Sequence, residues 1–163
     1  MTDKEVHSAL VRWLSAATGQ KFIKADQGGD RLSLPYGMVN LTGTAEVRTH
    51  AQNVEFSEDE DSERVMARPV IETEWRFSLH AYGEDPTSVL RPIRSAFEMA
   101  QAHEPLMPGL VIHEISQIRD VPEMVGERRE PRAQMDLMLR GLVRDGVLVD
   151  TIETYSFAFE REA

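Results

Sequence analysis

The stretch Ile71–Tyr82 reads IETEWRFSLHAY and alternates between two kinds of side chain. Successive side chains of a β-strand point to opposite faces of the sheet, so this period of two predicts a strand with one packed face. The packed face carries Ile71, Thr73, Trp75, Phe77, Leu79 and Ala81. The other face carries Glu72, Glu74, Arg76, Ser78 and His80, and we expect it to be solvated or covered by a neighbouring subunit.

Two segments flanking this strand have the period of an amphipathic helix. The first is Asp3–Thr18, which Asp3 is expected to cap and Gly19 to end. The second begins at Asp85-Pro86, and Pro92 within it predicts a kink or a later start. Their apolar stripes predict that both helices cover one face of the sheet.

The remaining alternating or apolar runs predict further strands. Three shorter ones are expected at residues 21–25, from Pro35 towards His50, and at residues 110–118. The chain ends in two long candidates, Ala133–Val143 and Val147–Phe159, joined at Arg144-Asp145-Gly146. Asp-Gly between two alternating runs is typical of a β-hairpin, because both turn residues must tolerate positive φ. The sequence therefore predicts a long C-terminal hairpin.

Residues 51–68 have almost no apolar periodicity and contain six acids between Glu55 and Glu63. Because such a composition buries too little apolar surface to offset the entropy of ordering, we expect a flexible, solvated loop. A calcium loop is disfavoured, since the run lacks alternating oxygen ligands and a central glycine. A more specific hypothesis is that the acids line a surface past which nucleic acid moves without sticking. The residues concerned are Glu58, Asp59, Glu60, Asp61 and Glu63.

The predicted order is helix, two strands, acidic loop, strand, helix and three strands. Strands that follow one another through short turns pair antiparallel. We therefore expect one α+β domain over residues 1–163, with a mainly antiparallel sheet, two helices packed on one face and the C-terminal hairpin.

Composition excludes several classes of function. The chain has 163 residues, no cysteine and a net charge of −10, so disulfides, thiolate nucleophiles and cysteine metal sites are ruled out. A sequence-reading DNA protein with a basic face is disfavoured. No window approaches the ~20 apolar residues of a membrane helix and the first residues do not resemble an export signal, so we expect a soluble protein without membrane contact.

A search for catalytic motifs finds no phosphate-binding loop, dinucleotide fingerprint, nucleophile elbow or zinc-protease helix. The five histidines form no pair at metal-binding spacing, and a site built from His80, His113 and Glu114 would need tertiary convergence. A small hydrolase using Asp136 and Glu114 is an alternative, but no nucleophile has a base near it in sequence. We predict no cofactor and no metal.

Four segments together resemble a known family. They are the helix Asp3–Thr18 followed by Lys24-Ala25-Asp26-Gln27, the strand opening Leu34-Pro35-Tyr36, the strand end His80-Ala81-Tyr82-Gly83, and the stretch Gln117–Leu137. The last is the most specific, with an acid and proline before an apolar run and then Glu127-Arg128-Arg129-Glu130-Pro131-Arg132. The chain resembles the neck or tail-terminator proteins of tailed bacteriophages, although Arg129 stands where that family usually has an aromatic residue.

This resemblance implies a structural, non-enzymatic virion protein of the tail and neck, present in the host cytoplasm during assembly. Such subunits assemble, commonly as a hexamer ring, on the last ring of the tail tube protein and stop its polymerisation. They present a docking surface to the head connector or adaptor protein, and DNA passes through the lumen. A head-completion or tail-completion adaptor has a similar size and topology and is an alternative, as is a monomeric binding module.

A closed ring requires two different surfaces on each subunit. We expect one to be the C-terminal hairpin and the other the charged segment before it. The predicted interface residues are Glu127, Arg128, Arg129, Glu130, Arg132, Arg144 and Asp145. The loop at residues 51–68 is expected to face the lumen or the docking partner.

Overall fold

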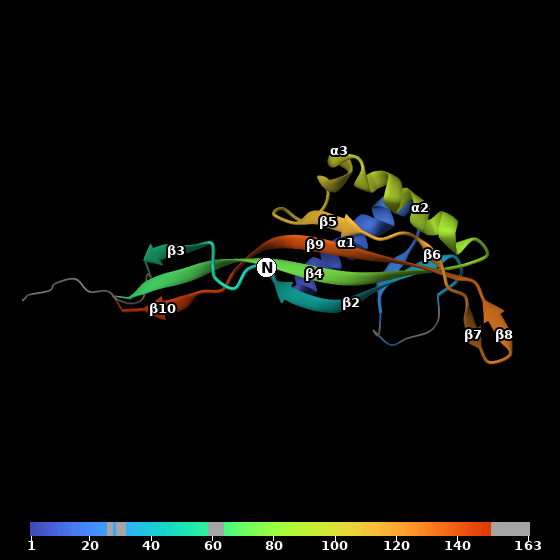
Figure 1. Cartoon of the computed structure of the whole chain (residues 1–163), viewed down its shortest axis with the longest axis horizontal. Helices are drawn as coiled ribbons and strands as arrows, with labels where there is room; N and C mark the ends of the chain where they lie inside the picture. The colour runs from blue at the N-terminus through green and yellow to red at the C-terminus, as the bar shows by residue number, and fades with distance from the viewer. Residues whose placement is uncertain (26–27, 29–31, 59–63, 151–163) are drawn as a thin grey trace, which may run out of the picture.

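The computed structural model describes residues 1–25, 28, 32–58 and 64–150, and it confirms the α+β class (Figure 1). Its centre is β4 (Val65–Tyr82), a strand of 18 residues. Along its second half, β4 pairs antiparallel with β2 (Tyr36–Glu46) on one side and with β9 (Arg132–Arg144) on the other. The sheet order is β1-β2-β4-β9-β5, with β1 (Phe22–Lys24) parallel to β2, and β5 (Val111–Ile115) and β6 (Arg119–Asp120) both paired to β9.

Two helices cover one face of this sheet, as the sequence predicts (Figure 1). They are α1 (Asp3–Thr18) and α2 (Pro86–Phe97), and a short α3 (Ala100–His103) follows α2. The cap of α1 is Thr2 and not Asp3: the Thr2 hydroxyl accepts from the Glu5 N–H, and the Glu5 carboxylate accepts from the Thr2 N–H. Asp85 caps α2 as expected, and the helix continues through Pro92.

The core lies between the helices and the predicted apolar face of β4. Trp75, Phe77, Leu79 and Ala81 are at most 1% exposed. They pack with residues of both helices and of β9, namely Leu10, Leu14, Leu90, Ile93, Met135, Leu137 and Leu139. The alternation of residues 71–82 therefore positions the sheet under the helices.

The predicted C-terminal hairpin is wrong. Val147–Val149 form β10, which pairs with β4 and not with β9. Arg144 is opposite Val70 and Val147 is opposite Ala67, so both strands advance by three residues and β10 continues β9 in the same register. β9 already pairs with β4 along one edge and with β5 and β6 along much of the other, so little of it is left for a returning strand. Residues 151–159 lie outside the described part of the chain.

The predicted loop at residues 51–68 is also wrong for the residues that can be compared. Residues 53–58 form β3 (Asn53–Glu58), which pairs antiparallel with the first residues of β4. The segment Asn53–Glu58 alternates between polar and apolar side chains, and its backbone finds a partner in Val65–Val70. Four of the five acids of the expected lumen-facing surface, Asp59, Glu60, Asp61 and Glu63, lie outside the described residues.

The charged segment before β9 belongs to a small separate hairpin. It consists of β7 (Glu123–Val125) and β8 (Arg128–Glu130), paired antiparallel, with Gly126 at φ 63° in the turn. In Figure 1 this hairpin projects from the end of the sheet opposite to β3 and β10. The subunit thus has a projecting element at each end.

Candidate functional site: a projecting arm and the cleft at its base

The main candidate surface is a three-stranded extension of the sheet, which we call the arm. It consists of β3, residues 65–70 of β4, and β10. Figure 1 shows the arm extending beyond the body, with no helix over it. Within the described part of the chain, β3 and β10 pair only with β4, so the outer edges of the arm are open to further pairing.

Register places apolar side chains across one face of the arm. Phe56 is opposite Ala67, and Ala67 is opposite Val147, so the three share a face. Phe56 is 67% exposed and Val147 is 62% exposed. Ala67 is an even number of residues from Trp75, so this is the face that the helices cover on the body. Large apolar side chains left exposed on a strand surface indicate a contact with another molecule.

The other face of the arm carries both polar and apolar side chains, since Met66 lies between Ser57 and Leu148, and Leu148 is 40% exposed. Arg144 Nε donates to both carboxylate oxygens of Glu55, at 3.0 and 3.1 Å. Arg68 donates to the Ser57 hydroxyl at 2.5 Å. These contacts tie β3, β4 and β9 together at the root of the arm. The side chains of Arg144 and Glu55 are both nearly half exposed. Their ion pair is therefore expected to position the strands and to add little to the free energy of unfolding.

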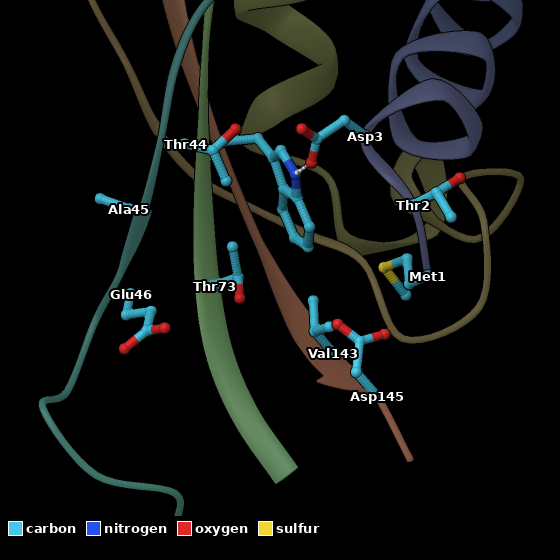
Figure 2. Close-up of a pocket in the computed structure, with 10 residues that line it drawn as sticks. Met1, Thr2, Asp3, Thr44, Ala45, Glu46, Thr73, Val143 and Asp145 are labelled. Atoms are coloured by element: carbon cyan, nitrogen blue, oxygen red, sulfur yellow. Dashed lines mark hydrogen bonds between the residues drawn. The ribbon is translucent and has the colours of Figure 1, made fainter. Parts of the chain in front are cut away.

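A cleft of about 470 Å³ lies where the helix layer ends and the arm begins (Figure 2). Its walls come from the N-terminus of α1, the end of β2, the middle of β4 and the end of β9. Within it, Trp75 Nε1 donates to Asp3 Oδ1 at 2.7 Å. Thr73 and Val143 lie on the same sheet face as the apolar row of the arm, so the cleft and this row lie along one face of the sheet. The lining residues are Met1, Thr2, Asp3, Thr44, Ala45, Glu46, Thr73, Trp75, Val143 and Asp145.

The structure separates the predicted interface residues into two groups. Arg144 ends β9 and Asp145 lines the cleft, so both belong to the base of the arm. Glu58, the one described member of the acidic set, is exposed at the end of β3. The others lie at the opposite end of the sheet, on or beside the β7–β8 hairpin: Glu127, Arg128, Arg129, Glu130 and Arg132.

The β7–β8 hairpin is fixed to the sheet through Arg132. The guanidinium donates to the Val121 carbonyl at 3.2 Å and to the Glu123 carboxylate at 2.8 Å. Glu127 and Arg129 are exposed, and Met124, opposite Arg129, is 65% exposed. The predicted charged surface therefore includes an apolar side chain, which suits a contact partly shielded from water.

The polar face of the body carries groups that could suggest catalysis. Ser78, His80 and Asp136 lie on this face, but not as a catalytic triad. The Ser78 hydroxyl donates directly to Asp136 Oδ1 at 2.9 Å and accepts from Gln134, and His80 Nδ1 has no hydrogen-bond partner. Burial, with a contribution from Arg132, lowers the pKa of His80. A nucleophile must face its base, and this arrangement does not provide that.

The hydrolase alternative gains no support from its two carboxylates. Arg119 holds the Asp136 carboxylate in an ion pair of 2.5 Å, and Glu114 is exposed on β5. Among the residues that the structure describes, no three His, Asp or Glu side chains could jointly hold a metal ion. No helix in the described ranges is long and apolar enough to cross a membrane.

Glu74 is a buried carboxylate on the polar face, with 9% of its side chain exposed. Arg76 donates to one of its oxygens at 3.0 Å, and Arg140 donates twice to the other at 3.0 and 3.1 Å. Burial alone would raise the pKa of Glu74, but the hydrogen bonds from Arg76 and Arg140 outweigh it and lower the pKa below its usual 4.5. The ion pair thus links β4 to β9 in the charged state.

Glu74→Gln is expected to lower the free energy of unfolding at pH 7 by about 1–2 kcal/mol, since both arginines are partly exposed and can regain water. The folded-state pKa is depressed, so this contribution is complete above the unfolded value of 4.5 and is lost as the pH falls through the folded pKa. Urea unfolding of both proteins from pH 7 to pH 3 should show the difference shrinking below pH 4.5. The control Glu98→Gln alters an exposed pair and should change stability by less than about 0.5 kcal/mol. A difference that does not depend on pH would contradict this role of Glu74.

The apolar residues of β3 are part of the arm that the sequence did not predict. Val54 and Phe56 stand among Glu55, Ser57 and Glu58, and the acids that follow dominate the composition. The signal that could have revealed them is the alternation of polar and apolar residues over Asn53–Glu58, which is the pattern of a half-buried strand.

Comparison with known protein families gives a match over residues 4–162, to a family described as phage neck terminator protein. This range includes the arm, the β7–β8 hairpin, the helix layer from residue 4 onward, and the cleft except for Met1, Thr2 and Asp3. A search of curated proteins finds no match.

Proposed function

Because this chain belongs to the phage neck terminator protein family, we propose that it caps the tail tube as a ring and joins the tube to the head connector or adaptor protein. In this role it acts by binding and not by catalysis. Family membership supports a structural role in the virion neck; the ring, its order of six and the partners are our proposal.

The observation that carries the proposal is the uncovered apolar face of the arm. A monomer that worked alone would expose Phe56 and Val147 to water without benefit, at a cost in solubility. In a ring, every subunit offers this face to a neighbour. A ring closes only when each subunit has two different complementary surfaces, and the arm and the body supply two.

The two ends of the sheet then have different tasks. We assign the arm to contacts between copies, and the β7–β8 hairpin to the tail tube or the connector. Met124, Glu127 and Arg129 are exposed there, which gives a partner both an apolar anchor and charges of both signs. Host cytoplasm is the site of assembly in this proposal.

The charge of the chain suits a lumen through which DNA passes. A net charge of −10 gives a ring with strong negative potential, and this repels phosphate over roughly one Debye length of 8 Å at physiological salt. We propose that Glu58 and the acids Asp59, Glu60, Asp61 and Glu63 face the lumen or the docking partner. DNA would then pass without binding.

Electron microscopy of the full chain mixed with tail tube protein tests the proposal. We expect tubes that stop growing, with a ring at one end, while tubes formed without the chain keep lengthening. Replacing Met124 by Asp should prevent end binding if the β7–β8 hairpin meets the tube. Rings that bind the connector but leave tube growth unchanged would contradict capping and favour a head-completion adaptor.

A further inference from the structure

We propose that the cleft at the base of the arm binds a basic side chain, arginine or lysine, of a partner protein. The carboxylates of Asp3, Glu46 and Asp145 line the cleft. Apart from the amino terminus of the chain, none of the described residues that line it is basic. Its volume of about 470 Å³ is in the range of sites that hold small ligands. The cleft itself does not depend on the proposed function, but the identity of the partner rests on it.

The subunit does not neutralise these three carboxylates itself. In the described part of the chain none of them belongs to an ion pair, although a basic residue is close to each in sequence. Arg144 pairs with Glu55 on the opposite face of the sheet. Arg48 pairs with Glu72, which also lies on that face. Lys4 lines a separate depression along α1. An incoming cation therefore meets three carboxylates that no other cation of the described chain holds.

A buried hydroxyl on the floor of the cleft points to a ligand independently of the acids. Thr73 is only 7% exposed, and within the described ranges its side chain has no hydrogen-bond partner. Register places it opposite Glu46, and Figure 2 shows it between Glu46 and Val143. A buried hydroxyl without a partner costs free energy. An N–H group of a ligand that enters the cleft would remove this cost.

The arrangement suits an extended cation and not a single ion. Among the described residues, no three acidic or histidine side chains could jointly hold a metal ion. A basic side chain has an apolar stem that packs on apolar groups such as Met1 and Val143, and a charged head with several donors. Asp3 Oδ1 already accepts from the Trp75 indole, so Asp3 Oδ2 remains for the ligand. The head can thus reach acceptors from α1, β2 and β4 together.

Titration of the full-length, ¹⁵N-labelled chain with N-acetyl-arginine amide tests the site by NMR. The Trp75 indole N–H reports on the cleft, because it donates to Asp3. The other tryptophan, Trp13, is an internal control: its indole donates to the Ala102 carbonyl, and it lies ten residues further along α1, about 15 Å away. We expect a saturable shift of the Trp75 signal and none of the Trp13 signal.

N-acetyl-citrulline amide is the matched ligand control, because it has nearly the same shape as the arginine amide but no charge. It should give no saturable shift of the Trp75 signal at the same concentrations and ionic strength. Equal shifts with both amides, or equal shifts of both tryptophans, would overturn the site. The measurement uses the isolated chain, so its result is independent of whether the chain caps tubes.

Two variants locate the binding groups. Glu46→Gln is expected to weaken binding of the arginine amide by about threefold or more, since it removes one carboxylate. Thr73→Val keeps the shape of the side chain and removes the hydroxyl, so it should weaken binding while the subunit remains folded. The control Glu84→Gln removes an exposed charge near the start of α2 and should leave the affinity unchanged. Equal losses for Glu46→Gln and Glu84→Gln would show a general effect of net charge and contradict the site.

A competition experiment identifies the partner. If a second copy supplies the basic side chain, saturating arginine amide should lower the mass of assemblies of the chain alone, measured by light scattering. If tail tube or connector protein supplies it, the amide should lower co-sedimentation of the chain with that protein. Binding of the amide without either effect would overturn the role of the cleft in partner binding. Uncapped tubes in the presence of the wild-type chain would instead contradict only the proposed function.

Discussion

Phe56→Asp is expected to abolish ring formation on tail tubes while leaving the subunit folded. Truncation of an anchor residue at the centre of an interface costs about 2–4 kcal/mol, which corresponds to a loss of about 30- to 700-fold in affinity per contact. Aspartate adds the penalty of a carboxylate against an apolar surface of the neighbouring subunit. Because a closed ring needs every contact, the loss multiplies around it.

The folded subunit should tolerate this change, since Phe56 is 67% exposed. Its free energy of unfolding should change by less than about 0.5 kcal/mol, measured by urea denaturation. Co-sedimentation with tail tube protein measures assembly. Ser57→Asp is the matched control, because it adds the same charge one residue away and keeps an acceptor for Arg68. Equal losses of assembly for both variants would show that charge on β3, and not the apolar face, is what matters.

Trp75→Ala should strongly destabilise the subunit. Trp75 is fully buried, and removal of a large aromatic side chain from a core costs about 3–5 kcal/mol. The indole also donates to Asp3 at the start of α1, so it holds the helix layer at the base of the arm (Figure 2). Trp75→Phe keeps most of the packing but loses this hydrogen bond, so about 1–2 kcal/mol is expected.

Urea denaturation followed by far-UV circular dichroism measures both variants. Val111→Ala is the control, since Val111 is 56% exposed on β5 and should change stability by less than about 0.5 kcal/mol. If Trp75→Phe is as stable as the wild type, the hydrogen bond to Asp3 does not fix the helix layer.

The helices and the central strand could be predicted because their signals are local and agree with the packing. The alternation of residues 71–82 coincides with the face that is buried under α1 and α2. The bounds of α1 follow from the apolar period and from Gly19, which takes the left-handed conformation at φ 67°. In these segments propensity, pattern and tertiary contacts favour the same structure.

The arm could not be predicted, because it depends on pairing between distant residues. Asp145-Gly146 has the sequence of a hairpin turn, yet Val147 pairs with Ala67, 80 positions earlier in the chain. A Cβ atom at Gly146 would come within 2.6 Å of the Met66 sulfur, so a larger residue there would require the Met66 side chain to shift. Local turn chemistry carries no information about such a partner.

The candidate site was predicted only in part for the same reason. Arg144 and Asp145 were placed at an interface as parts of a hairpin, and both lie at the base of the arm through a different pairing. The sequence did not predict Phe56 as part of the site, because six acids in a short window are typical of disorder. The alternation within Asn53–Glu58, in which every second residue can pack, carried less weight than this composition.

A cryo-electron microscopy reconstruction of a tail tube capped by this chain, at a resolution that shows side chains, tests most directly whether the arm joins the subunits of a ring. Phe56 and Val147 of each subunit are expected to lie against a neighbouring subunit. A reconstruction in which the apolar face of the arm points into solvent or into the lumen would contradict it.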